Sequence, residues 1–240
     1  MFADLHSHIL PGVDDGPKTL EDSVNLVKQA ISDGTSNVIA TPHFYAMQHE
    51  LDNRIQNVIK QKELLEQRLF SEGVSFEKML LGFEVRFFKG ISKCDSLRKL
   101  SLNYSKVLLI ELGFDNISAD VLNELNELVY QGYTVILAHV ERYYKAHGFS
   151  LLKRQLKDKV FLTQVNASSL KDGHFKRGTN KLFKENIVDF IASDMHSVEH
   201  RPSELTDAFG IIRDKYGVLV KNKLINNANE MFERICTENL

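Results

Sequence analysis

Short apolar runs alternate with longer stretches of helical periodicity along most of the chain. Each run is four to six residues long, and several are rich in Val and Ile, which is typical of strands buried on both faces. We predict seven strands, at residues 1–5, 37–40, 78–82, 106–110, 134–138, 160–165 and 187–192.

Between these runs, apolar residues recur every three or four positions, which predicts helices. Residues 20–33 are the clearest case, because Thr19 can cap the first turn together with Asp22 and Gly34 can end the helix. The other predicted helices are residues 51–72, 119–131, 203–215 and 226–235. Strand and helix alternate about seven times, which favours a parallel sheet closed into a barrel.

The size and charge of the chain agree with one α/β barrel. The chain has 240 residues, and a single barrel commonly fills about 250, so residues 1–240 are expected to form one domain. The charged fraction of 26% is typical of a globular protein. The net charge of −2 lacks the basic excess expected of a protein that binds nucleic-acid phosphates.

Two cysteines, Cys94 and Cys236, cannot build a disulfide scaffold and indicate a reducing compartment. A phosphatase with a cysteine nucleophile needs an arginine six positions later, but Leu100 follows Cys94 at that distance. Cys236 lies too near the end of the sequence. The polar residues near the N-terminus do not form a secretory signal, and no apolar run reaches the roughly 18 residues of a membrane span. We therefore expect a soluble, cytoplasmic protein without a thiol nucleophile.

His, Asp and Glu residues stand at the carboxyl ends of six of the seven predicted strands. His6 and His8 are two positions apart, so both side chains project to one side of the first strand. Asp194 and His196 repeat this spacing after the last strand. Parallel barrel strands end on one face, where such a cluster requires cations. Nitrogen and oxygen donors without thiolates suit Mn, Fe or Zn, and their number predicts more than one ion, bridged by a carboxylate.

The other candidate ligands at strand ends are His43, Glu84, Glu111 and His139. Taken singly, each has an ordinary explanation as a hydrogen-bonded histidine or a strand-end acid, but their joint placement indicates a metal site. Asp4 is interpreted as a partner that orients a ligand histidine. The histidines in polar surroundings are interpreted as surface residues, namely His49, His147, His174 and His200.

Three segments surround the candidate ligands: VDDGP at residues 13–17, HVERY at 139–143 and SDMH at 193–196, with Arg201 and Pro202 following the last. Together with the HxH of the first strand, they resemble the polymerase and histidinol phosphatase (PHP) superfamily. Within it, they resemble the manganese-dependent tyrosine-protein phosphatases of bacterial capsule and exopolysaccharide operons. The resemblance covers nearly the whole chain. HxH alone would indicate only the superfamily, whereas the three segments point to the phosphatase branch.

The resemblance implies a distorted (β/α)7 barrel of the PHP type with two to three metal ions, Mn or alternatively Fe, Mg, Co or Zn. The ligand sets that it implies are His6, His8, Glu84 and Asp194 for one ion, Glu84, Glu111 and His139 for a second, and Asp15, His43 and His196 for a third. Arg142 and Arg201 match the family's phosphate-binding arginines, and His43 and His196 are expected to contribute to catalysis.

One position departs from the family pattern. Val140 stands where the family usually has a proline, which places the rigidity of the loop before Arg142 in question. Several aromatic residues follow the ligand-bearing strands, and they either line a substrate groove or pack the top of the barrel. These residues are Phe44, Tyr45, Phe87, Phe88 and Phe114.

The implied activity is hydrolysis of phosphotyrosine on a bacterial tyrosine kinase or a related protein, which would regulate capsule or exopolysaccharide synthesis. The expected partner is the phosphorylated tail of such a membrane-associated kinase. As a hypothesis, metal ions lower the pKa of a water that attacks phosphorus, while Arg142 and Arg201 stabilise the phosphoryl oxygens. A phenolate leaving group needs less help from a general acid than an alkoxide does.

Three other functions remain to be weighed. A small-molecule phosphomonoesterase, such as a histidinol-phosphate phosphatase, would use the same barrel and metals. A metal-dependent nuclease is disfavoured by the net charge and by the lack of basic clusters with aromatics. A non-catalytic binding module would be expected to have lost ligands or arginines, and none is missing. We expect no nucleic-acid partner and no membrane insertion, and the sequence does not determine the oligomeric state.

Overall fold

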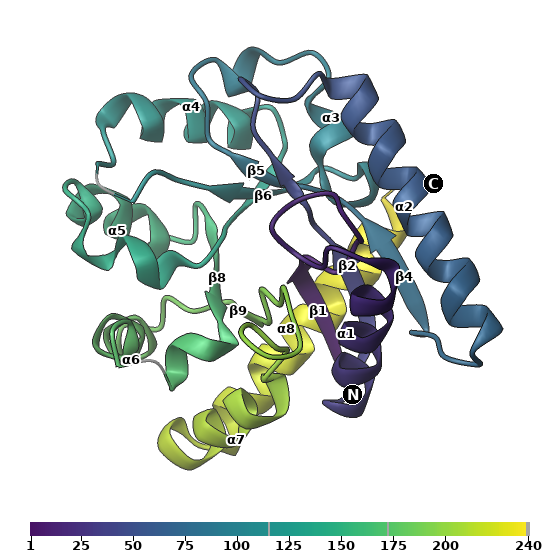
Figure 1. The fold of residues 1–240 in the computed structure, drawn as a ribbon. Coiled ribbons are helices and arrows are strands. Elements are labelled where there is room, and N and C mark those ends of the chain that lie inside the picture. Colours follow the sequence, from purple (N-terminus) through teal and green to yellow (C-terminus); the bar gives the residue numbers. More distant parts are fainter. Residues whose placement is uncertain (115, 172, 239–240) are drawn as a thin grey trace.

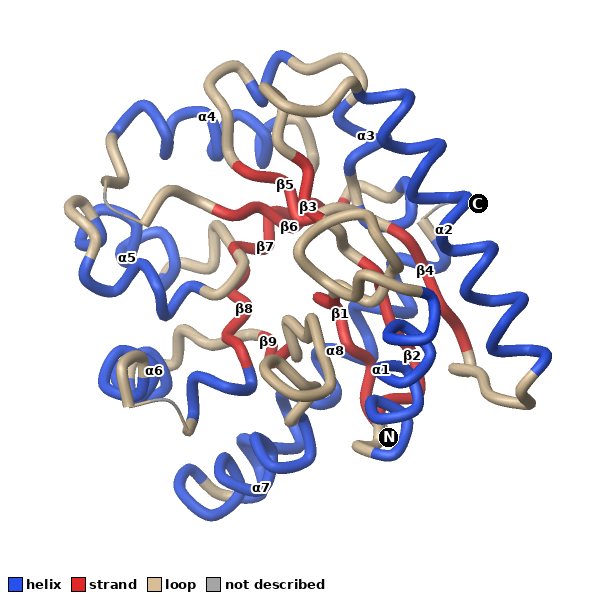
Figure 2. The backbone as a smooth tube through the Cα atoms, viewed as in Figure 1, coloured by secondary structure: helices blue, strands red, loops and turns tan. Residues whose placement is uncertain are grey.

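The computed structural model describes residues 1–114, 116–171 and 173–238. Viewed along the axis of the sheet, the strands form a ring with the helices around its outside (Figure 2). The strands are β1 Phe2–Ser7, β2 Thr35–Ala40, β3 His43–Phe44, β4 Lys78–Leu81, β5 Glu84–Arg86, β6 Val107–Glu111, β7 Thr134–Leu137, β8 Leu162–Asn166 and β9 Phe190–Ala192. All seven predicted strands are present within a few residues, and the paired strands are parallel.

The ring consists of two sheets, in the orders β1-β2-β4 and β3-β5-β6-β7-β8-β9. The short strands β3 and β5 were not predicted, because they continue β2 and β4 after two-residue breaks. Gly82 N donates to Ala40 O at 2.9 Å, so the two neighbouring segments remain hydrogen-bonded across these breaks. At the other side of the ring, Asp194 N donates to His6 O and His8 N donates to Met195 O, both at 2.9 Å. These bonds close the predicted seven-stranded, distorted barrel.

Helices cover the outside of the ring (Figure 1). They are α1 Leu20–Ser32, α2 Leu51–Ser71, α3 Leu97–Leu100, α4 Ala119–Tyr130, α5 Phe149–Lys157, α6 Lys176–Lys184, α7 Leu205–Tyr216 and α8 Val218–Thr237. The predicted cap of α1 is confirmed, since the side chains of Thr19 and Asp22 each accept a hydrogen bond from the other's backbone N–H at 3.1 Å.

Three helices, α3, α5 and α6, were not predicted, and the last helix is longer than expected. It begins at Val218 rather than at residue 226, because the chain turns sharply at Gly217, where φ is +96°. No helix in the described part of the chain is long and apolar enough to cross a membrane.

The last helix, α8, passes behind the ring of strands, where it appears in yellow in Figure 1. Its residues Ala228 and Phe232 form one buried cluster with the inward-facing residues Leu5, Leu109 and Ile136 of three strands. Burying this apolar surface fills the amino-terminal half of the barrel interior. The carboxyl-terminal half is left for polar side chains.

A β-bulge in β1 separates these two halves. Between Asp4 and Ser7 the strand advances three residues while β2 advances only two, from Val38 to Ala40. An extra residue reverses the alternation of side chains along the bulged strand. As a result, Leu5 packs in the apolar cluster with α8, while the next residue, His6, lies with the polar residues at the mouth of the barrel.

Candidate metal centre

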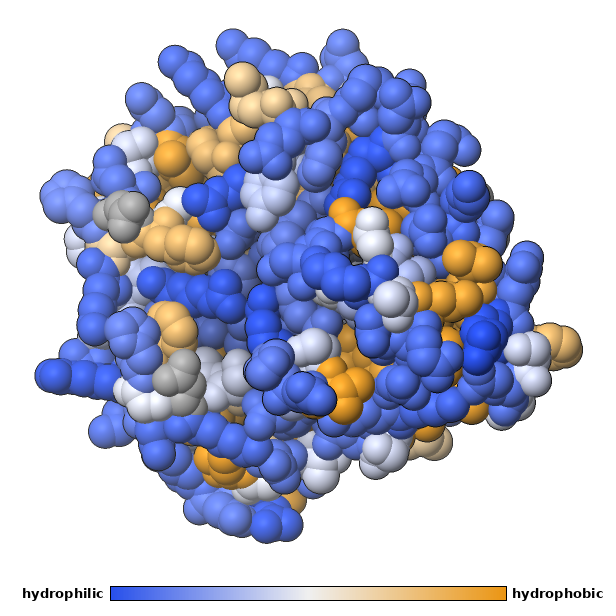
Figure 3. All heavy atoms as spheres, viewed as in Figure 1, coloured by the Kyte–Doolittle hydropathy of each residue, from blue (hydrophilic) through white to orange (hydrophobic). Residues whose placement is uncertain are grey.

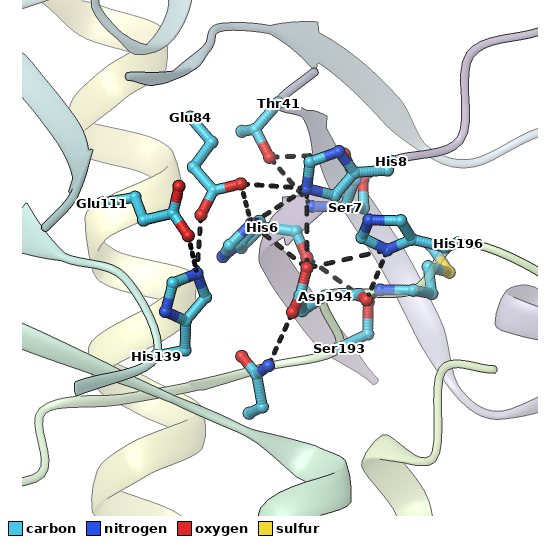
Figure 4. Close-up of polar contacts among 12 residues, drawn as sticks. His6, Ser7, His8, Thr41, Glu84, Glu111, His139, Ser193, Asp194 and His196 are labelled. Carbon is cyan, nitrogen blue, oxygen red and sulfur yellow. Dashed lines mark hydrogen bonds and ion pairs between the residues drawn. The ribbon is translucent and has the colours of Figure 1, made fainter. Parts of the chain in front are cut away.

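The histidine and acidic side chains predicted as ligands converge at the carboxyl-terminal mouth of the barrel. Figure 4 shows Glu84 between two groups, with Glu111 and His139 on one side and His6 and His8 on the other. Most of these side chains are buried, whereas His43 is half-buried and Asp15 is 59% exposed. They form three groups that share the central carboxylate of Glu84.

The first group forms a cage of four donor atoms. His6 Nε2 and His8 Nε2 lie 3.1 Å apart. Both lie 3.3–3.4 Å from Glu84 Oε2 and 3.4–3.5 Å from Asp194 Oδ1. Two donors about 2.1 Å from an ion in a tetrahedral site are about 3.4 Å apart, and these distances agree with that value. The donor atoms of His6, His8 and Asp194 all lie within 4.8 Å of one another, so these three side chains can hold one ion, with Glu84 Oε2 beside the two histidines.

The tautomers of these histidines also suit a metal. His6 Nδ1 lies 3.1 Å from Gln164 Oε1, and His8 Nδ1 lies 2.7 Å from Asp14 Oδ2. Since these partners are acceptors, each Nδ1 carries the proton and each Nε2 presents a lone pair. Two lone pairs that face each other repel unless a cation lies between them. Partners of this kind orient metal-ligating histidines in other proteins.

The second group lies on the other side of Glu84. His139 Nε2 is 2.7 Å from Glu84 Oε1 and 3.6 Å from Glu111 Oε1. The other oxygen of Glu111 accepts from Arg86 Nη1 at 3.0 Å. Glu84 thus presents one oxygen to each of the two groups, as a bridging carboxylate does.

The third group lies nearest to solvent. Asp15 Oδ1 is 3.4 Å from His43 Nε2 and 3.2 Å from His196 Nε2. His43 Nδ1 lies 2.8 Å from Glu84 Oε2, and the rings of His8 and His196 stack with their centroids 4.0 Å apart. The shared Glu84 and the stacked histidines connect this group to the first one.

The electrostatics of the cluster favour positive charge at its centre. Burial opposes ionisation of Glu84, yet the neighbouring histidines hold the pKa of Glu84 well below its usual range. The imidazoles of His196 and His43 lower the pKa of Asp15 in the same way. Burial disfavours charge on His43, but Asp15 and Glu84 raise the pKa of His43 to about 9. The carboxylates thus remain charged and attract protons or metal ions.

Several buried polar atoms in the cluster make no hydrogen bond of acceptable geometry among the described residues, although some lie close to the ligand atoms named above. They are Glu84 Oε2, His43 Nδ1, His139 Nδ1 and His196 Nε2. Buried polar atoms are almost always paired, so such a concentration requires an explanation. Three of the four atoms point into the ligand groups described above, so the residues present fit metal ions.

A chain of buried hydrogen bonds supports the first two groups. Gln164 Oε1 accepts from His139 N at 2.7 Å as well as from His6, and Gln164 Nε2 donates to Asn166 Oδ1 at 2.8 Å. Asn166 Nδ2 then donates to Asp194 Oδ2 at 2.6 Å. Both amides come from β8, the predicted strand without a ligand. Their alternation on that strand is the only signal in the sequence, and neither amide is a typical metal ligand, so they were not predicted.

The backbone is strained at two of the predicted ligands. His139 has φ of +34° and Asp194 has φ of +52°, in the left-handed region that non-glycine residues seldom adopt. Strain of this kind is retained where the surrounding structure holds a functional group in place. Here the bonds of Gln164 and Asn166 hold these two residues.

Asp4 supports the ligand histidine His6 through a hydrogen bond to its backbone. Its carboxylate accepts from the backbone N–H groups of His6 and Ser193 and from Ser193 Oγ, so it joins the backbone of β1 to that after β9. The residue that orients a ligand ring through a carboxylate is Asp14, which pairs with His8 and was not predicted.

A further residue missed in the sequence is Arg54 of α2, which is 8% exposed. Its guanidinium donates to Val13 O at 2.5 Å and to His43 O at 2.7 Å. These bonds attach the loop that carries Asp15 to the strand that carries His43. An arginine in the first turn of a helix gives no sign in the sequence of such a contact.

Arginines surround the mouth of the site. Arg142 Nη2 and Arg201 Nη2 both donate to Asp194 Oδ2, at 3.1 and 2.7 Å. The guanidinium groups of Arg86 and Arg142 lie 5.3 and 5.9 Å from the centroid of the Phe114 ring. Both predicted arginines thus lie at the mouth, and Arg86 is a third that was not predicted.

The loop that carries Arg142 is held by burial rather than by proline. Val140–Lys145 is a 3-10 helix, and both Val140 and Tyr143 are fully buried. The Tyr143 hydroxyl accepts from Leu112 N at 2.9 Å. The question raised by Val140 is therefore answered by packing.

The aromatic residues predicted at the groove differ in their positions. Tyr45 and Phe114 lie at the mouth, with ring centroids 5.2 Å from His43 and 6.0 Å from His139. Phe44 is only 4% exposed and belongs to the core, while Phe87 and Phe88 pack against the core.

Among the histidines assigned to the surface, His49 was interpreted wrongly. It is half-buried, and its Nδ1 accepts from Tyr45 N at 3.0 Å, so it supports the backbone of that mouth residue. His147, His174 and His200 are exposed, as expected.

Two cavities flank the mouth. One of about 870 Å³ is lined by residues that include Asp15, His196 and Arg201, and one of about 560 Å³ is lined by residues that include Arg142. Figure 3 shows a hollow at the centre of this face, bordered mainly by hydrophilic side chains. The site is therefore open on both sides.

Comparison with known proteins relates the whole chain to one group. Residues 2–233 match the family described as "Capsular polysaccharide synthesis, CpsB/CapC". The chain is 30% identical to the tyrosine-protein phosphatase CpsB of Streptococcus agalactiae, over 96% of this chain and 98% of that protein. It is 29% identical to the tyrosine-protein phosphatase YwqE of Bacillus subtilis, over 94% of this chain and 89% of that protein.

The structural comparison gives the same result. A crystal structure from a study of YwqE of Bacillus subtilis and CpsB of Streptococcus pneumoniae, described there as metal-dependent tyrosine phosphatases, superposes with a TM-score of 0.83. It is 26% identical in sequence and covers 96% of this chain and 94% of that chain. A lactonase from Listeria monocytogenes superposes with a TM-score of 0.56 at 10% identity, which shows only a shared fold.

Proposed function

The chain belongs to the CpsB/CapC family of capsular polysaccharide synthesis, and on this premise we propose that it is a metal-dependent tyrosine-protein phosphatase. The observation that supports this activity most directly is the convergence of three donor groups around Glu84, with arginines at the rim. We propose that residues 1–240 act as a single phosphatase domain.

The proposed ligands follow the three donor groups. One ion is bound by His6, His8, Glu84 and Asp194, a second by Glu84, Glu111 and His139, and a third by Asp15, His43 and His196. Mn is the proposed ion, with Fe, Mg, Co or Zn as alternatives, because the donors are nitrogen and oxygen without thiolates.

When bound, the ions lower the pKa of water and neutralise charge on the phosphoryl group. The chain contributes positioning and charge. Arg142 and Arg201 each direct one nitrogen to Asp194 and are 27% and 38% exposed, so their remaining N–H groups can bind phosphoryl oxygens at the mouth. Their planar guanidinium groups suit two-point contact with such oxygens.

The residues around the mouth also suit an aromatic substrate. The half-buried ring of Tyr45 lies near His43 and the exposed ring of Phe114 lies near His139, and both provide surfaces against which a phenyl ring can pack. A phenolate, with a pKa of about 10, leaves more readily than an alkoxide, so no strong general acid is required. His43 and His196 are proposed to contribute to catalysis as ligands on the solvent side of the site.

We further propose that the substrate is the phosphorylated tail of a membrane-associated bacterial tyrosine kinase, and that the enzyme acts in the cytoplasm. The open mouth between two cavities supports a protein substrate. The free thiols of Cys94 and Cys236 support a reducing compartment.

The test compares kcat/KM for a phosphotyrosine peptide with kcat/KM for histidinol phosphate, in Mn²⁺ and after chelation. Preference for the peptide that disappears with the chelator supports the proposal. Preference for histidinol phosphate would assign the chain to small-molecule metabolism. Activity that survives complete removal of metal would contradict a metal-dependent reaction on either substrate.

A further inference from the structure

A basic pocket adjoins the metal centre on one side. It has a volume of about 560 Å³ and lies between the 3-10 helix Val140–Lys145 and α6. The charged and aromatic side chains that define it are Arg142, Lys145, Arg177, Lys181, Tyr144 and Phe175. Arg142 belongs both to this pocket and to the mouth of the metal site, because its Nη2 donates to Asp194 Oδ2. The two sites therefore share a wall.

The walls of the basic pocket are packed together closely. A Cβ placed on Gly178 of α6 would lie 3.1 Å from Tyr144 Cβ, which shows how near the two elements approach. Across this contact, Lys181 Nζ lies 5.1 Å from the centroid of the Tyr144 ring. A pocket formed by two packed helical elements keeps its shape without a ligand, which favours binding.

Three of the four cations of the basic pocket have no ion-pair partner in the described part of the chain, whereas Arg142 pairs with Asp194. Within the described ranges, no carboxylate lies within ion-pair distance of Lys145, Arg177 or Lys181. The one acidic residue among the described lining residues, Glu141, is only 3% exposed and accepts from the backbone N–H of Asn166. A protein with a net charge of −2 thus presents a concentrated positive surface beside its active site.

The cavity on the other side of the mouth has a different character. Its lining combines the acids Asp15, Asp22 and Glu199 with the cations Lys18 and Arg201. Charge therefore distinguishes the two sides of the metal centre. An anionic group on a substrate segment that crosses the mouth would therefore be attracted to the basic side only.

We propose that the basic pocket is a second anion subsite for the substrate peptide, which binds an acidic side chain near the phosphotyrosine. This inference rests on the proposed phosphotyrosine phosphatase activity. The anion is a carboxylate of Asp or Glu or the phosphate of a second phosphotyrosine. Lys145, Arg177 and Lys181 supply the charge, and Tyr144 and Phe175 supply aromatic surface for the stem of the bound side chain.

The spacing along the peptide follows from chain geometry. An extended peptide advances about 3.4 Å per residue, so a side chain about two or three residues from the phosphotyrosine reaches a pocket that shares Arg142 with the metal site. When the phosphotyrosine lies at the metal centre, only one end of the bound peptide extends toward the basic side. The preference should therefore depend on whether the acidic residues precede or follow the phosphotyrosine.

The experiment measures kcat/KM on a set of phosphotyrosine peptides in Mn²⁺ at low ionic strength. One peptide has Ser on both sides, one has two Asp residues two and three positions before the phosphotyrosine, and one has them after it. In two further peptides, the non-hydrolysable phosphonomethyl-phenylalanine replaces the Asp pair. We expect one placement to raise kcat/KM about five- to tenfold over the Ser peptide, and about 0.5 M NaCl to remove most of the gain.

The test variant is the double charge reversal Arg177→Glu with Lys181→Glu, both at exposed positions of α6. The ratio of acidic to neutral peptide is compared within each variant, so that any change at the metal centre cancels. We expect the double variant to lose the preference. The matched control is Lys184→Glu, an exposed lysine of the same helix outside the pocket, which should retain the preference.

The possible outcomes separate the two proposals. Failure of the wild type to hydrolyse even the Ser peptide contradicts the phosphatase activity itself. Hydrolysis of all peptides at equal kcat/KM overturns the subsite alone. Preference that persists in the double variant, or that falls equally in Lys184→Glu, also overturns it, because general surface charge would then be the cause. Preference for Asp, for the phosphonate or for both supports the subsite and identifies the anion.

Discussion

Replacing Gln164 with leucine tests whether the hydrogen bonds beneath the site position its ligands. Gln164 is 1% exposed and contacts three groups. It accepts from His6 Nδ1 at 3.1 Å and from His139 N at 2.7 Å, and it donates to Asn166 Oδ1 at 2.8 Å. Leucine has a similar volume but makes none of these bonds, so the change removes them without leaving a large cavity.

The structure gives two expected magnitudes for Gln164→Leu. His139 N and Asn166 Oδ1 become buried without partners at about 1–3 kcal/mol each, so the free energy of unfolding of the metal-free protein should fall by about 2–6 kcal/mol. The ring of His6 loses the acceptor that fixes its tautomer. Loss of such a partner typically weakens metal binding about 10- to 100-fold, or about 1.4–2.7 kcal/mol.

Two assays and one matched variant separate these effects. Urea unfolding of the metal-free protein measures stability, and calorimetric titration with Mn²⁺ measures affinity. In Gln164→Glu, the carboxylate can still accept from His6 and His139 but faces Asn166 Oδ1. It should therefore lose stability yet keep metal affinity within about threefold, since carboxylates commonly orient ligand histidines. If Gln164→Leu binds Mn²⁺ as tightly as the wild type, Gln164 does not position His6 and the reasoning is wrong.

Three further predictions concern the bridging ligand, a surface hydrogen bond and a packed glycine. Glu84→Gln should lower the metal content measured by mass spectrometry and reduce kcat/KM at least about 100-fold, because one residue serves all three donor groups; unchanged metal content would contradict this. Burial raises the pKa of Glu124, but hydrogen bonds from Gly90 N and Ser92 outweigh this effect and lower the pKa overall. Glu124 therefore stabilises the fold at pH values above the ordinary glutamate pKa of 4.5, and this contribution is lost as pH falls below that value. Glu124→Gln should accordingly reduce the free energy of unfolding by about 1 kcal/mol at pH 7 and by progressively less in acid, and a deficit that grows in acid would refute the assignment. Gly82→Ala should destabilise the protein by about 1–3 kcal/mol in urea unfolding, because the new Cβ would lie 2.5 Å from a Leu102 side-chain carbon. Gly210→Ala in α7, where the new Cβ would meet no neighbouring atom within 4 Å, should stabilise the protein by about 0.5–1 kcal/mol. Equal effects of the two substitutions would show that close packing at Gly82 is unimportant.

Local patterns in the sequence were sufficient for most of the secondary structure. A buried strand is recognisable from a short apolar run, and the capping box of α1 from Thr19 and Asp22, because these signals involve residues close in sequence. The helices that were missed carry weaker signals: α6 has charged residues on most of its surface, and the start of α8 has an exposed Leu219 that does not follow the apolar stripe.

The sequence alone also placed the candidate ligands at one face of a barrel, because the ends of parallel strands must meet there. Which residue supports which ligand could not be read in this way. Gln164 and Asn166 of β8 are ordinary polar residues in sequence, and only the pairing of β8 between β7 and β9 brings them beneath His6, His139 and Asp194.

The bulge in β1 shows most clearly what only the tertiary structure decided. In a regular strand, Leu5 and His6 would point to opposite faces of the sheet. Here both point into the barrel, where Leu5 packs in the apolar cluster with α8 and His6 belongs to the metal centre. With the extra residue, β1 pairs with β2 and its end also forms hydrogen bonds with the segment after β9. Residue types and local periodicity determined which side chains were available. Bonds between strands distant in sequence decided where they point, since a strand's register is a property of the pair and not of one segment.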